Sequence, residues 1–365
     1  GAMASVIGKI RSDGQYIVHY NDEIIVDAKA NQVTKGFLYN RRFSPINTNL
    51  DAPKLNSNLD YNTELINLLA HENIASRKSV YDKYDKQVQG RIITEAGRAD
   101  SGILAPFNSK NYPKEIRNIG IALSTDHNPL YGTIDPYWAG VNAVVEAMRN
   151  VAAVGATPHA LTDCLCFGNP EKESQMWEFV ESVKGIKDAC NAITLKHNPE
   201  HATPIIAGNV SFYNESKNGS IPPSPIVSCL GKINDVNDCI GMDFSLIGSN
   251  IIMVGKRKSE LGGSAFYHLH NELGSTLPKP DLQEAKNQIH ALTDCIDKNL
   301  VLSCHDIADG GVAVALAEMT FKNKIGCNVS IESNLKTDEI LFSETGGFIL
   351  EVGDENINEI VRCFS

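Results

Sequence analysis

The chain has 365 residues, of which 42% are hydrophobic and 21% charged, so it is long enough for two or three domains with cores of their own. Its formal net charge of −11 argues against a nucleic-acid or anionic-membrane surface, although metal ions and backbone amides can still hold phosphates. No apolar run reaches the roughly 18 residues of a membrane-spanning helix, so we expect neither nucleic acid nor a membrane among its partners.

Residues 5–39 read as a small β-rich segment, in which turn dipeptides separate short β-type runs. Because three short strands cannot close a core, we expect this segment to be the tail of a domain that lies upstream. Residues 40–62 are rich in Asn, Pro, Asp and Ser, which predicts a linker. The strands expected in the first segment are residues 6–10, 16–20 and 23–26.

Residues 63–238 are expected to form an α/β domain, and residues 239–365 a second one that is cut short. In both, strand-like apolar runs alternate with stretches of helical periodicity, which favours helices packed on a sheet. The expected strands are residues 119–125, a strand from 159, and residues 204–207, 226–233, 250–255, 329–331 and 348–352. The expected helices are residues 65–75, 80–88, 138–154, 175–191, 282–299, 311–320 and one from 357 onward.

Nine cysteines occur at scattered positions, several of them in apolar runs. An odd number without regular spacing is typical of reduced core thiols, so we expect a cytoplasmic protein. Cys164 and Cys166 have no second pair at zinc-ligand spacing.

Two segments, residues 162–171 and 205–215, place small, amide and carboxylate residues directly after β-type runs. At such positions an α/β framework presents backbone N–H groups and oxygen ligands to a phosphate or a metal ion. One segment alone would more simply be a turn. Two of them, together with the acidic motifs that follow, favour a nucleotide-phosphate site.

Three acids and an amide are the candidate ligands of a metal ion. Glu146 and Asn150 lie four residues apart and therefore on one face of the expected helix, although this spacing equally fits an exposed pair. Asp126 directly follows an expected strand, and Asp306 precedes the Gly310-Gly311 pair that opens an apolar helix. Hard oxygen ligands of this kind suit Mg²⁺ shared with phosphates.

Each of these motifs also has a structural interpretation. Asp309 before the two glycines fits a helix N-cap, with Asp306 facing a ligand. His127 and His305, beside the two aspartates, are more simply structural residues. No lysine-containing phosphate loop occurs, which excludes an ordinary P-loop, and no Ser/His/Asp or Cys/His set is visible.

From about residue 76 to its end, the chain resembles the second half of phosphoribosylformylglycinamidine synthase, a purine-pathway ligase, in its small bacterial and archaeal form. Ordered motifs over nearly the whole chain carry the resemblance, and residues 5–39 look like the tail of the preceding domain. The matching stretches are residues 81–85, 125–129, 135–137, 146–150, 162–171, 208–215, 260–264 and 305–311.

The resemblance implies an α/β (α+β) fold of two repeats, each a ferredoxin-like α/β domain plus a second α/β domain, as in aminoimidazole ribonucleotide synthetase. The two halves would pack as a pseudo-dimer around a shared barrel-like sheet. The implied reaction converts formylglycinamide ribonucleotide, ATP and ammonia to the amidine, ADP and phosphate through an iminophosphate. The implied partners are the first half of the same synthase, a glutaminase subunit that supplies the ammonia, and a small accessory subunit.

The resemblance also assigns individual residues. It implies that Asp163 and Gly208 contact the nucleotide, Asn209 a Mg²⁺ that bridges the phosphates, and Ser211 the substrate. The metal ligands of a second, non-catalytic nucleotide site, with ADP as its structural ligand, fall on Asp126, Glu146, Asn150 and Asp306.

The chain departs from the family pattern at four positions and lacks one loop. His127 stands where Cys is usual, Cys166 where Asn is usual, Asp309 for Glu and Ala308 for Ser. The histidine-rich substrate loop of the first half is not in this chain, so we assign no catalytic residue and expect no synthase activity from the chain alone. The missing barrel partner should leave apolar surface, which predicts a homodimer or aggregation.

Two other classes of function stay open. One is another ATP-dependent enzyme of the same superfamily, such as a selenophosphate synthetase, thiamine-phosphate kinase or hydrogenase-maturation dehydratase. These lack the 208–211 Gly-Asn-Val-Ser run. The other is a non-catalytic module that binds a nucleotide with Mg²⁺ or serves as a docking surface. Binding without turnover would favour this second class.

Overall fold

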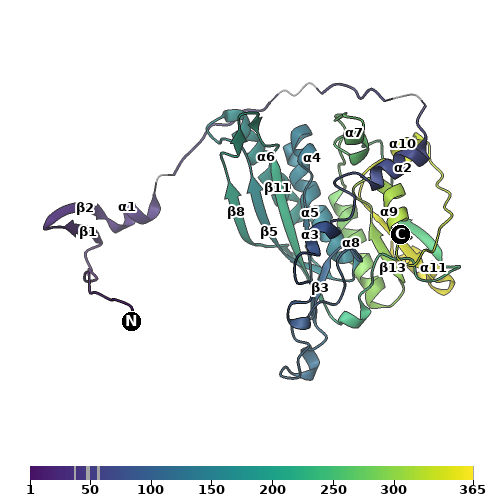
Figure 1. Cartoon of the computed structure of the whole chain (residues 1–365), viewed down its shortest axis with the longest axis horizontal. Helices are drawn as coiled ribbons and strands as arrows, with labels where there is room; N and C mark the ends of the chain where they lie inside the picture. Colours follow the sequence, from purple (N-terminus) through teal and green to yellow (C-terminus); the bar gives the residue numbers. More distant parts are fainter. Residues whose placement is uncertain (37, 47–49, 56–57, 365) are drawn as a thin grey trace. The chain divides into compact units, whose positions relative to one another are not determined.

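The N-terminal part of the chain is a hairpin followed by a short helix. The computed structural model describes residues 1–36, 38–46, 50–55 and 58–364 (Figure 1). These residues divide into two compact units, Gly1–Arg42 and Phe43–Ser365. In the first unit, β1 (Gln15–Tyr20) and β2 (Glu23–Lys29) pair antiparallel around Asn21 and Asp22, whose φ angles of 47° and 65° give the turn favoured in tight hairpins, and α1 (Ala30–Lys35) follows.

The strand predicted at residues 6–10 is wrong, because this stretch contains no regular element. Its side chains Val6, Ile7 and Ile10 are almost fully exposed. A β-type sequence forms a strand only where a partner strand supplies its hydrogen bonds and a buried face receives its side chains.

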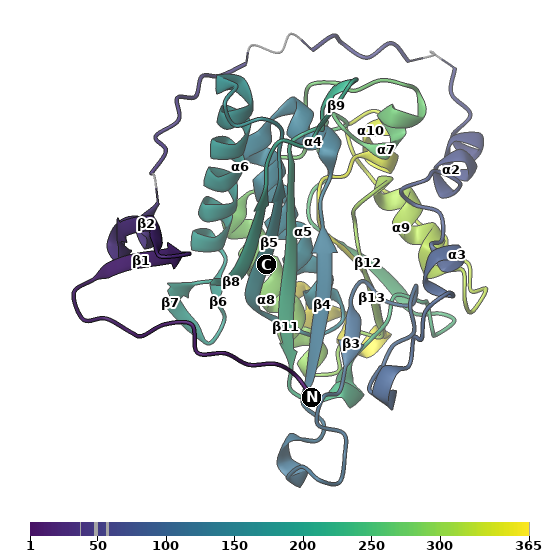
Figure 2. The same ribbon diagram turned by 60° about the vertical axis from the view of Figure 1, so that its left-hand side comes forward.

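A five-stranded sheet organises the second unit. Its strand order is β3-β4-β11-β5-β8, with β5 and β8 parallel and the other pairs antiparallel. Figure 2 shows these strands running side by side. Their bounds are β3 Gly102–Leu104, β4 Gly120–Asp126, β5 Thr157–Cys166, β8 Ile205–Ser211 and β11 Ser224–Ile233.

Two long helices cover one face of this sheet. The prediction of a helix at residues 138–154 is confirmed by α5 (Pro136–Ala153), which begins at the N-cap Asp135 and packs against α6 (Glu173–Ala192), β4 and β11. The apolar side chains of α5 are buried almost all round, because α8 (Leu282–Asp297) contacts it as well. The main hydrophobic core therefore lies along α5.

The opposite face and the β8 edge of the sheet carry exposed apolar side chains. Leu123 on β4 is 44% exposed, and Ile206 and Val210 on the edge strand β8 are 63% and 49% exposed. Apolar exposure along a sheet edge is typical of a surface that another element or chain covers.

The C-terminal part is built on a second, three-stranded antiparallel sheet. Its order is β12-β14-β13, formed by Asn250–Val254, Phe348–Val352 and Ser303–Asp306. All five residues of β14 are buried, because helices cover both faces of this central strand. On one face lie α8 and α11 (Ile357–Cys363), and on the other lies α9 (Gly311–Met319).

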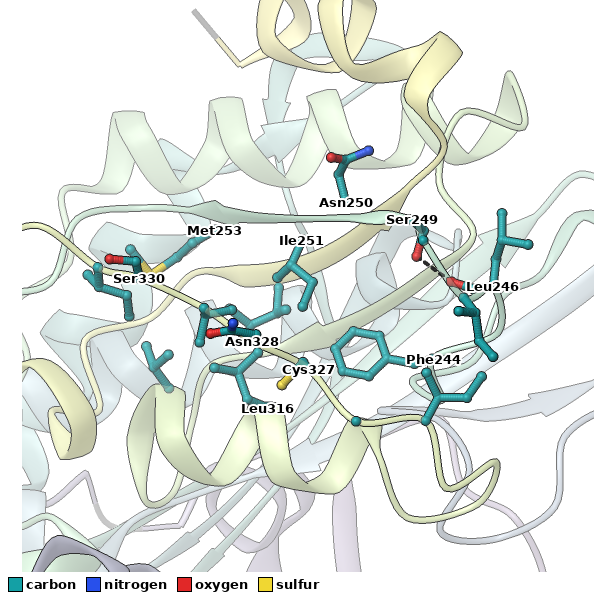
Figure 3. A pocket seen from close by; sticks show the side chains of 18 of the residues that line it. Phe244, Leu246, Ser249, Asn250, Ile251, Met253, Leu316, Cys327, Asn328 and Ser330 are labelled. Atoms are coloured by element: carbon teal, nitrogen blue, oxygen red, sulfur yellow. Dashed lines mark hydrogen bonds between the residues drawn. The ribbon is translucent and has the colours of Figure 1, made fainter.

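Three further predictions differ from the structure. The strand expected at residues 329–331 is wrong, since that segment is irregular and lines a cavity (Figure 3). The helix expected at 65–75 is α2 (Tyr61–Leu69), which starts earlier because Asp60 caps it. The helix expected at 80–88 is only the single turn of α3 (Lys78–Tyr81).

The remaining elements are short. Among the described residues, no helix combines the length and the apolar composition needed to span a membrane. The other helices are α4 Pro129–Ile134, α7 Ala265–Leu269 and α10 Thr337–Phe342, with 3₁₀ turns at Val88–Gly90, Lys114–Ile116, Val236–Asp238 and Asp354–Asn356. The other strands are β6 Thr194–Leu195, β7 Asn198–Ala202, β9 Glu215–Ser216 and β10 Gly219–Ser220.

A half-buried acid on α6 gives a pH-dependent stability. Burial raises the pKa of Glu178 to about 7. A carboxyl whose pKa is higher in the folded than in the unfolded chain costs stability as the pH rises between these two values. After discounting for solvent screening, we expect Glu178→Gln to stabilise the fold by about 1 kcal/mol at pH 8 and to have a much smaller effect at pH 5. Urea titrations at both values measure this, and an equal offset at both would contradict it.

Candidate metal and nucleotide site

The end of β4 and the middle of α5 bring an acid and an amide into contact. Asn150 Nδ2 donates a hydrogen bond of 2.9 Å to Asp126 Oδ1. The other oxygens of the pair, Asp126 Oδ2 and Asn150 Oδ1, are buried and have no hydrogen-bond partner. Buried oxygens are normally satisfied, so two that remain free at one place fit the coordination of a hard cation such as Mg²⁺.

A buried arginine connects the other two predicted ligands. Arg149 Nη2 lies 3.4 Å from Asp306 Oδ2 on β13 and 4.0 Å from Glu146 Oε2 on α5. Gly346 leaves the space for it, since a Cβ there would lie 2.0 Å from Arg149 Nη1. Arg149 therefore joins Glu146 to Asp306, and sequence reasoning missed this cation. The signal for it was the spacing of Glu146 and Arg149 by three residues on one helix.

Burial makes the charges of this acidic cluster costly. Burial, followed by the charge of Asp306, raises the pKa of Asp126 to about 7. Burial, followed by the charge of Asp126, raises the pKa of Glu146 well above its usual range. Burial and Asp100 raise the pKa of Asp306 to about 6. Carboxylates that repel one another in a buried place keep their charges only when a cation joins them, which a divalent metal would do.

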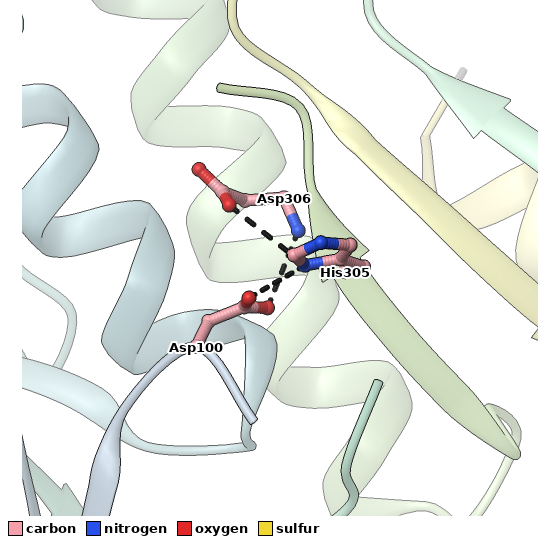
Figure 4. A group of neighbouring side chains, drawn as sticks. All are labelled: Asp100, His305 and Asp306. Atoms are coloured by element: carbon pink, nitrogen blue, oxygen red, sulfur yellow. Dashed lines mark hydrogen bonds and ion pairs between the residues drawn. The ribbon is translucent and has the colours of Figure 1, made fainter. Parts of the chain in front are cut away.

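His305 is held between two carboxylates beside this cluster, and Figure 4 shows one of them, Asp100. Its Nδ1 lies 2.6 Å from Asp100 Oδ1 and its Nε2 lies 2.9 Å from Glu318 Oε2. Burial alone would lower the pKa of His305, but the two carboxylates outweigh it and raise that pKa well above the usual range. Asp100, His305 and Asp306 bring possible ligand atoms within 4.8 Å of one another. With both ring nitrogens engaged, His305 acts as an ion-pair partner.

The two glycine-containing turns near the cluster, residues 261–265 and 309–311, both donate hydrogen bonds to the carboxylate of Glu344. Glu344 Oε1 accepts hydrogen bonds from the backbone N–H groups of Ala265 and Gly310, at 2.8 and 2.9 Å. Its Oε2 accepts one from the Tyr131 hydroxyl at 2.8 Å. Asp309 is not the N-cap of α9, because that position is taken by Gly310 with a φ of 79°. The glycines are needed for the left-handed turn.

Asp163 and Gly208 lie in the same row across the sheet as Asp126. The register pairs Asp126 with Val227, Val227 with Asp163, and Asp163 with Gly208. A Cβ on Gly208 would lie 2.5 Å from Asp163 Oδ1, so this glycine leaves room for the carboxylate. Burial raises the pKa of Asp163. Because neighbouring strands are about 4.8 Å apart, Asp126 and Asp163 are separated by about 10 Å along this row.

Asn209 and Ser211 point to the other face of the sheet. They pair with Cys164 and Cys166, one residue out of phase with Asp163, and successive strand residues face opposite sides. Asn209 Nδ2 lies 3.8 Å from Cys164 Sγ. The residues assigned to the reacting substrates are thus neighbours along β5 and β8 but lie on two faces of the sheet. Asp163 and Gly208 lie on one face, and Asn209 and Ser211 lie on the other.

Comparison with known proteins agrees with this architecture. The family model for the N-terminal domain of AIR synthase related proteins matches residues 112–233, and the model for the C-terminal domain matches residues 247–364. The chain belongs to the AIR synthase related protein family. These matches confirm the predicted α/β fold class of this AIR synthase related protein.

Curated relatives of this AIR synthase related protein are subunits of one enzyme. It is 42% identical to phosphoribosylformylglycinamidine synthase subunit PurL of Methanothrix thermoacetophila, over 99% of this chain and 46% of that protein. It is 36% identical to the subunit of the same name from Methanocaldococcus jannaschii, over 99% of this chain and 49% of that protein. The predicted resemblance to phosphoribosylformylglycinamidine synthase is confirmed, and the chain spans about half the length of these relatives.

Solved structures share the fold of this AIR synthase related protein. One is described as T. maritima PurL complexed with FGAR, with a TM-score of 0.61 and 18% identity over 84% of this chain and 47% of that one. Another is T. maritima PurL complexed with ATP, with a TM-score of 0.57 and 14% identity over 93% of this chain and 46% of that one. At this level of identity the likeness concerns the fold alone.

Proposed function

We propose that this chain supplies one half of an ATP-dependent carbon–nitrogen ligase that converts formylglycinamide ribonucleotide to the amidine. The observation that carries the proposal is the set of Asp126, Glu146, Asn150 and Asp306, of which Asn150 and Asp306 are buried, with two buried oxygens that have no partner. The names of the curated relatives, and the description of the T. maritima structures as complexes with ATP and FGAR, support the same reaction.

In this proposal the four-residue set holds Mg²⁺, which supplies a positive charge to the phosphates of a bound nucleotide. The contacts of Arg149 with Glu146 and Asp306 keep both carboxylates at one place before the metal arrives. This nucleotide is ADP held structurally or ATP. Neither would require a conventional phosphate loop, because metal and backbone amides can hold phosphates.

A second group of residues serves the reacting substrates in this proposal. Asp163 and Gly208 contact the ATP that reacts, Asn209 binds its Mg²⁺, and Ser211 contacts the ribonucleotide. ATP phosphorylates the amide oxygen to an iminophosphate, and ammonia then displaces the phosphate. Asn209 and Ser211 lie on the uncovered face of the sheet, where another polypeptide can complete the site.

The partners follow from the same reasoning. Curated relatives are named as subunits, which supports association with further polypeptides. We infer that these are the first half of the synthase, a glutaminase that releases ammonia from glutamine, and a small accessory subunit, all in the cytoplasm. Without the first half, the open sheet face should pair with a second copy. We also infer that residues 63–238 and residues 239–365 form two separate domains.

A non-catalytic nucleotide-binding module is the second candidate. The observation that favours it is that the four-residue acidic set is complete within this chain, whereas Asn209 and Ser211 face outward. Nucleotide binding by the isolated chain, without turnover either alone or with the first half, would favour this candidate over the ligase.

The ligase proposal predicts turnover only from the combined halves. The chain alone, with ATP, formylglycinamide ribonucleotide and ammonium, is expected to release no ADP or amidine. A mixture with the first half of a PurL relative is expected to form both. In that mixture Ser211→Ala should raise the substrate KM about tenfold, because a hydrogen bond to the substrate is lost. The matched control Ser216→Ala, exposed at the end of β9, should not. Turnover by the chain alone, or none by the mixture, would contradict the proposal.

A further inference from the structure

Two cysteine side chains lie next to each other on the uncovered face of the main sheet. Cys164 and Cys166 alternate along β5 with Leu165, which is buried against the helices, so both cysteines point away from that core. Both are free and only partly buried, and their Sγ atoms are 3.8 Å apart. The strand therefore presents two thiols together at a place that solvent can reach.

The geometry of this pair suits a bound cation better than a disulfide. Residues two positions apart on an extended strand are separated by about 6.6 Å. The Cβ atoms of a disulfide are only about 3.8 Å apart, so a disulfide between these cysteines would require the strand to bend. In tetrahedral coordination, two sulfurs that each bind Zn²⁺ at about 2.3 Å lie about 3.8 Å from each other. The observed separation of the two sulfurs matches this coordination while the strand stays extended.

A third donor group adjoins the pair from the neighbouring strand β8. The parallel register places Asn209 opposite Cys164, and Asn209 Nδ2 lies 3.8 Å from Cys164 Sγ. Turning this amide over brings its oxygen, which has free lone pairs, to the same position. In the described part of the chain, no further His, Cys, Asp or Glu side chain joins the two sulfurs as a ligand. A tetrahedral cation would therefore keep one position for water or a small molecule.

We propose that Cys164 and Cys166 form a binding site for a thiophilic divalent cation such as Zn²⁺, with Asn209 as the third ligand. On binding, each thiol gives its proton to solvent, and the two thiolate sulfurs form the bonds to the metal. Mg²⁺ prefers oxygen ligands and does not bind the sulfur pair. Binding needs no nucleotide, so it does not depend on the proposed ligase function. If that function holds, Zn²⁺ and the Mg²⁺ of the reacting ATP exclude each other at Asn209.

Titration of the reduced chain with Co²⁺ tests the proposal. Co²⁺ stands in for Zn²⁺, and its bonds to thiolates give a charge-transfer absorption band that the oxygen ligands of the acidic cluster do not give. The parent should show this band, and added Zn²⁺ should remove it. Cys164→Ser and Cys166→Ser should each weaken the affinity for Co²⁺ at least about tenfold, because a charged ligand is lost. The matched control Cys327→Ser, which removes an exposed thiol outside the pair, should not.

A further variant tests the third ligand without removing a thiol. Asn209→Asp puts a carboxylate oxygen where the amide lies, and carboxylates are common ligands of Zn²⁺. The affinity for Co²⁺ should therefore rise about tenfold, since the new ligand is charged. An unchanged affinity would overturn the assignment of Asn209.

Two results would overturn the site itself. One is the absence of the thiolate band in the parent, which would mean that the two thiols are merely in contact. The other is an equal affinity of the parent and both serine variants of the pair, which would mean that other cysteines hold the cation. Circular dichroism of each protein separates a loss of binding from a loss of the fold.

Discussion

A valine in place of Gly185 is expected to destabilise the fold by about 3 kcal/mol or more, which is a large part of the stability of an ordinary domain. The helices α5 and α6 cross at two glycines. A Cβ on Gly185 would lie 2.0 Å from the backbone oxygen of Tyr137, and one on Gly140 would lie 2.3 Å from that of Ser182. Both neighbours are main-chain atoms of long helices, so they cannot move aside without separating the two elements that cover the sheet.

Urea unfolding followed by circular dichroism measures this effect. Lys187→Val, two residues along on the exposed side of α6, is the matched control and should cost about 0.5 kcal/mol through helix propensity alone. A Gly185→Val protein as stable as the control would show that the close helix crossing is wrong.

Replacing Arg149 by methionine is expected to destabilise the metal-free protein by about 3 kcal/mol at pH 8, because it leaves the buried Asp306 and the half-buried Glu146 without their cation. The loss should be smaller at pH 5.5. An acid whose pKa is raised in the folded state costs stability at pH values above its ordinary pKa, and Asp306, with a pKa of about 6, takes up a proton on acidification.

The comparison is between urea midpoints of the parent, Arg149→Met and Arg149→Lys at both pH values. Lysine keeps the charge and should recover part of the stability at pH 8. An equal loss for Arg149→Met at pH 8 and pH 5.5 would mean that only packing was removed, and that the acids do not depend on this guanidinium.

Local sequence pattern was sufficient for the long and buried elements. The strand β14 was predicted at its observed residues, 348–352, because its apolar run is short and bounded by glycines. The strand predictions failed where a pairing partner decides whether a strand forms. The runs at 6–10 and 329–331 have β-type residues, but in the structure neither meets a strand to pair with. Strand propensity largely reflects the surroundings that a strand finds, and these cannot be known from the run itself.

The candidate site was predictable in its residue types but less so in its arrangement. Asn150 does contact Asp126, and Arg149 joins Glu146 to Asp306, but a single metal site formed by all four residues stays a prediction. Asp100 was missed because it comes from a loop 205 positions before its partner His305, and nothing in the spacing connects them. The division of Asp163 from Asn209 and Ser211 follows from the register between β5 and β8, which sequence pattern does not give.

Calorimetric titration of Mg²⁺–ADP and Mg²⁺–ATP into the chain tests the central claim most directly. Asp306→Asn removes one proposed ligand, and Asp354→Asn, exposed at the turn before α11, is the matched control. The account predicts binding by the parent and by Asp354→Asn, with at least a tenfold weaker affinity for Asp306→Asn because a charged metal ligand is lost. Absence of binding by the parent would contradict it. The acidic cluster would then be a structural feature, and only Asp163, Gly208, Asn209 and Ser211 would remain as functional candidates.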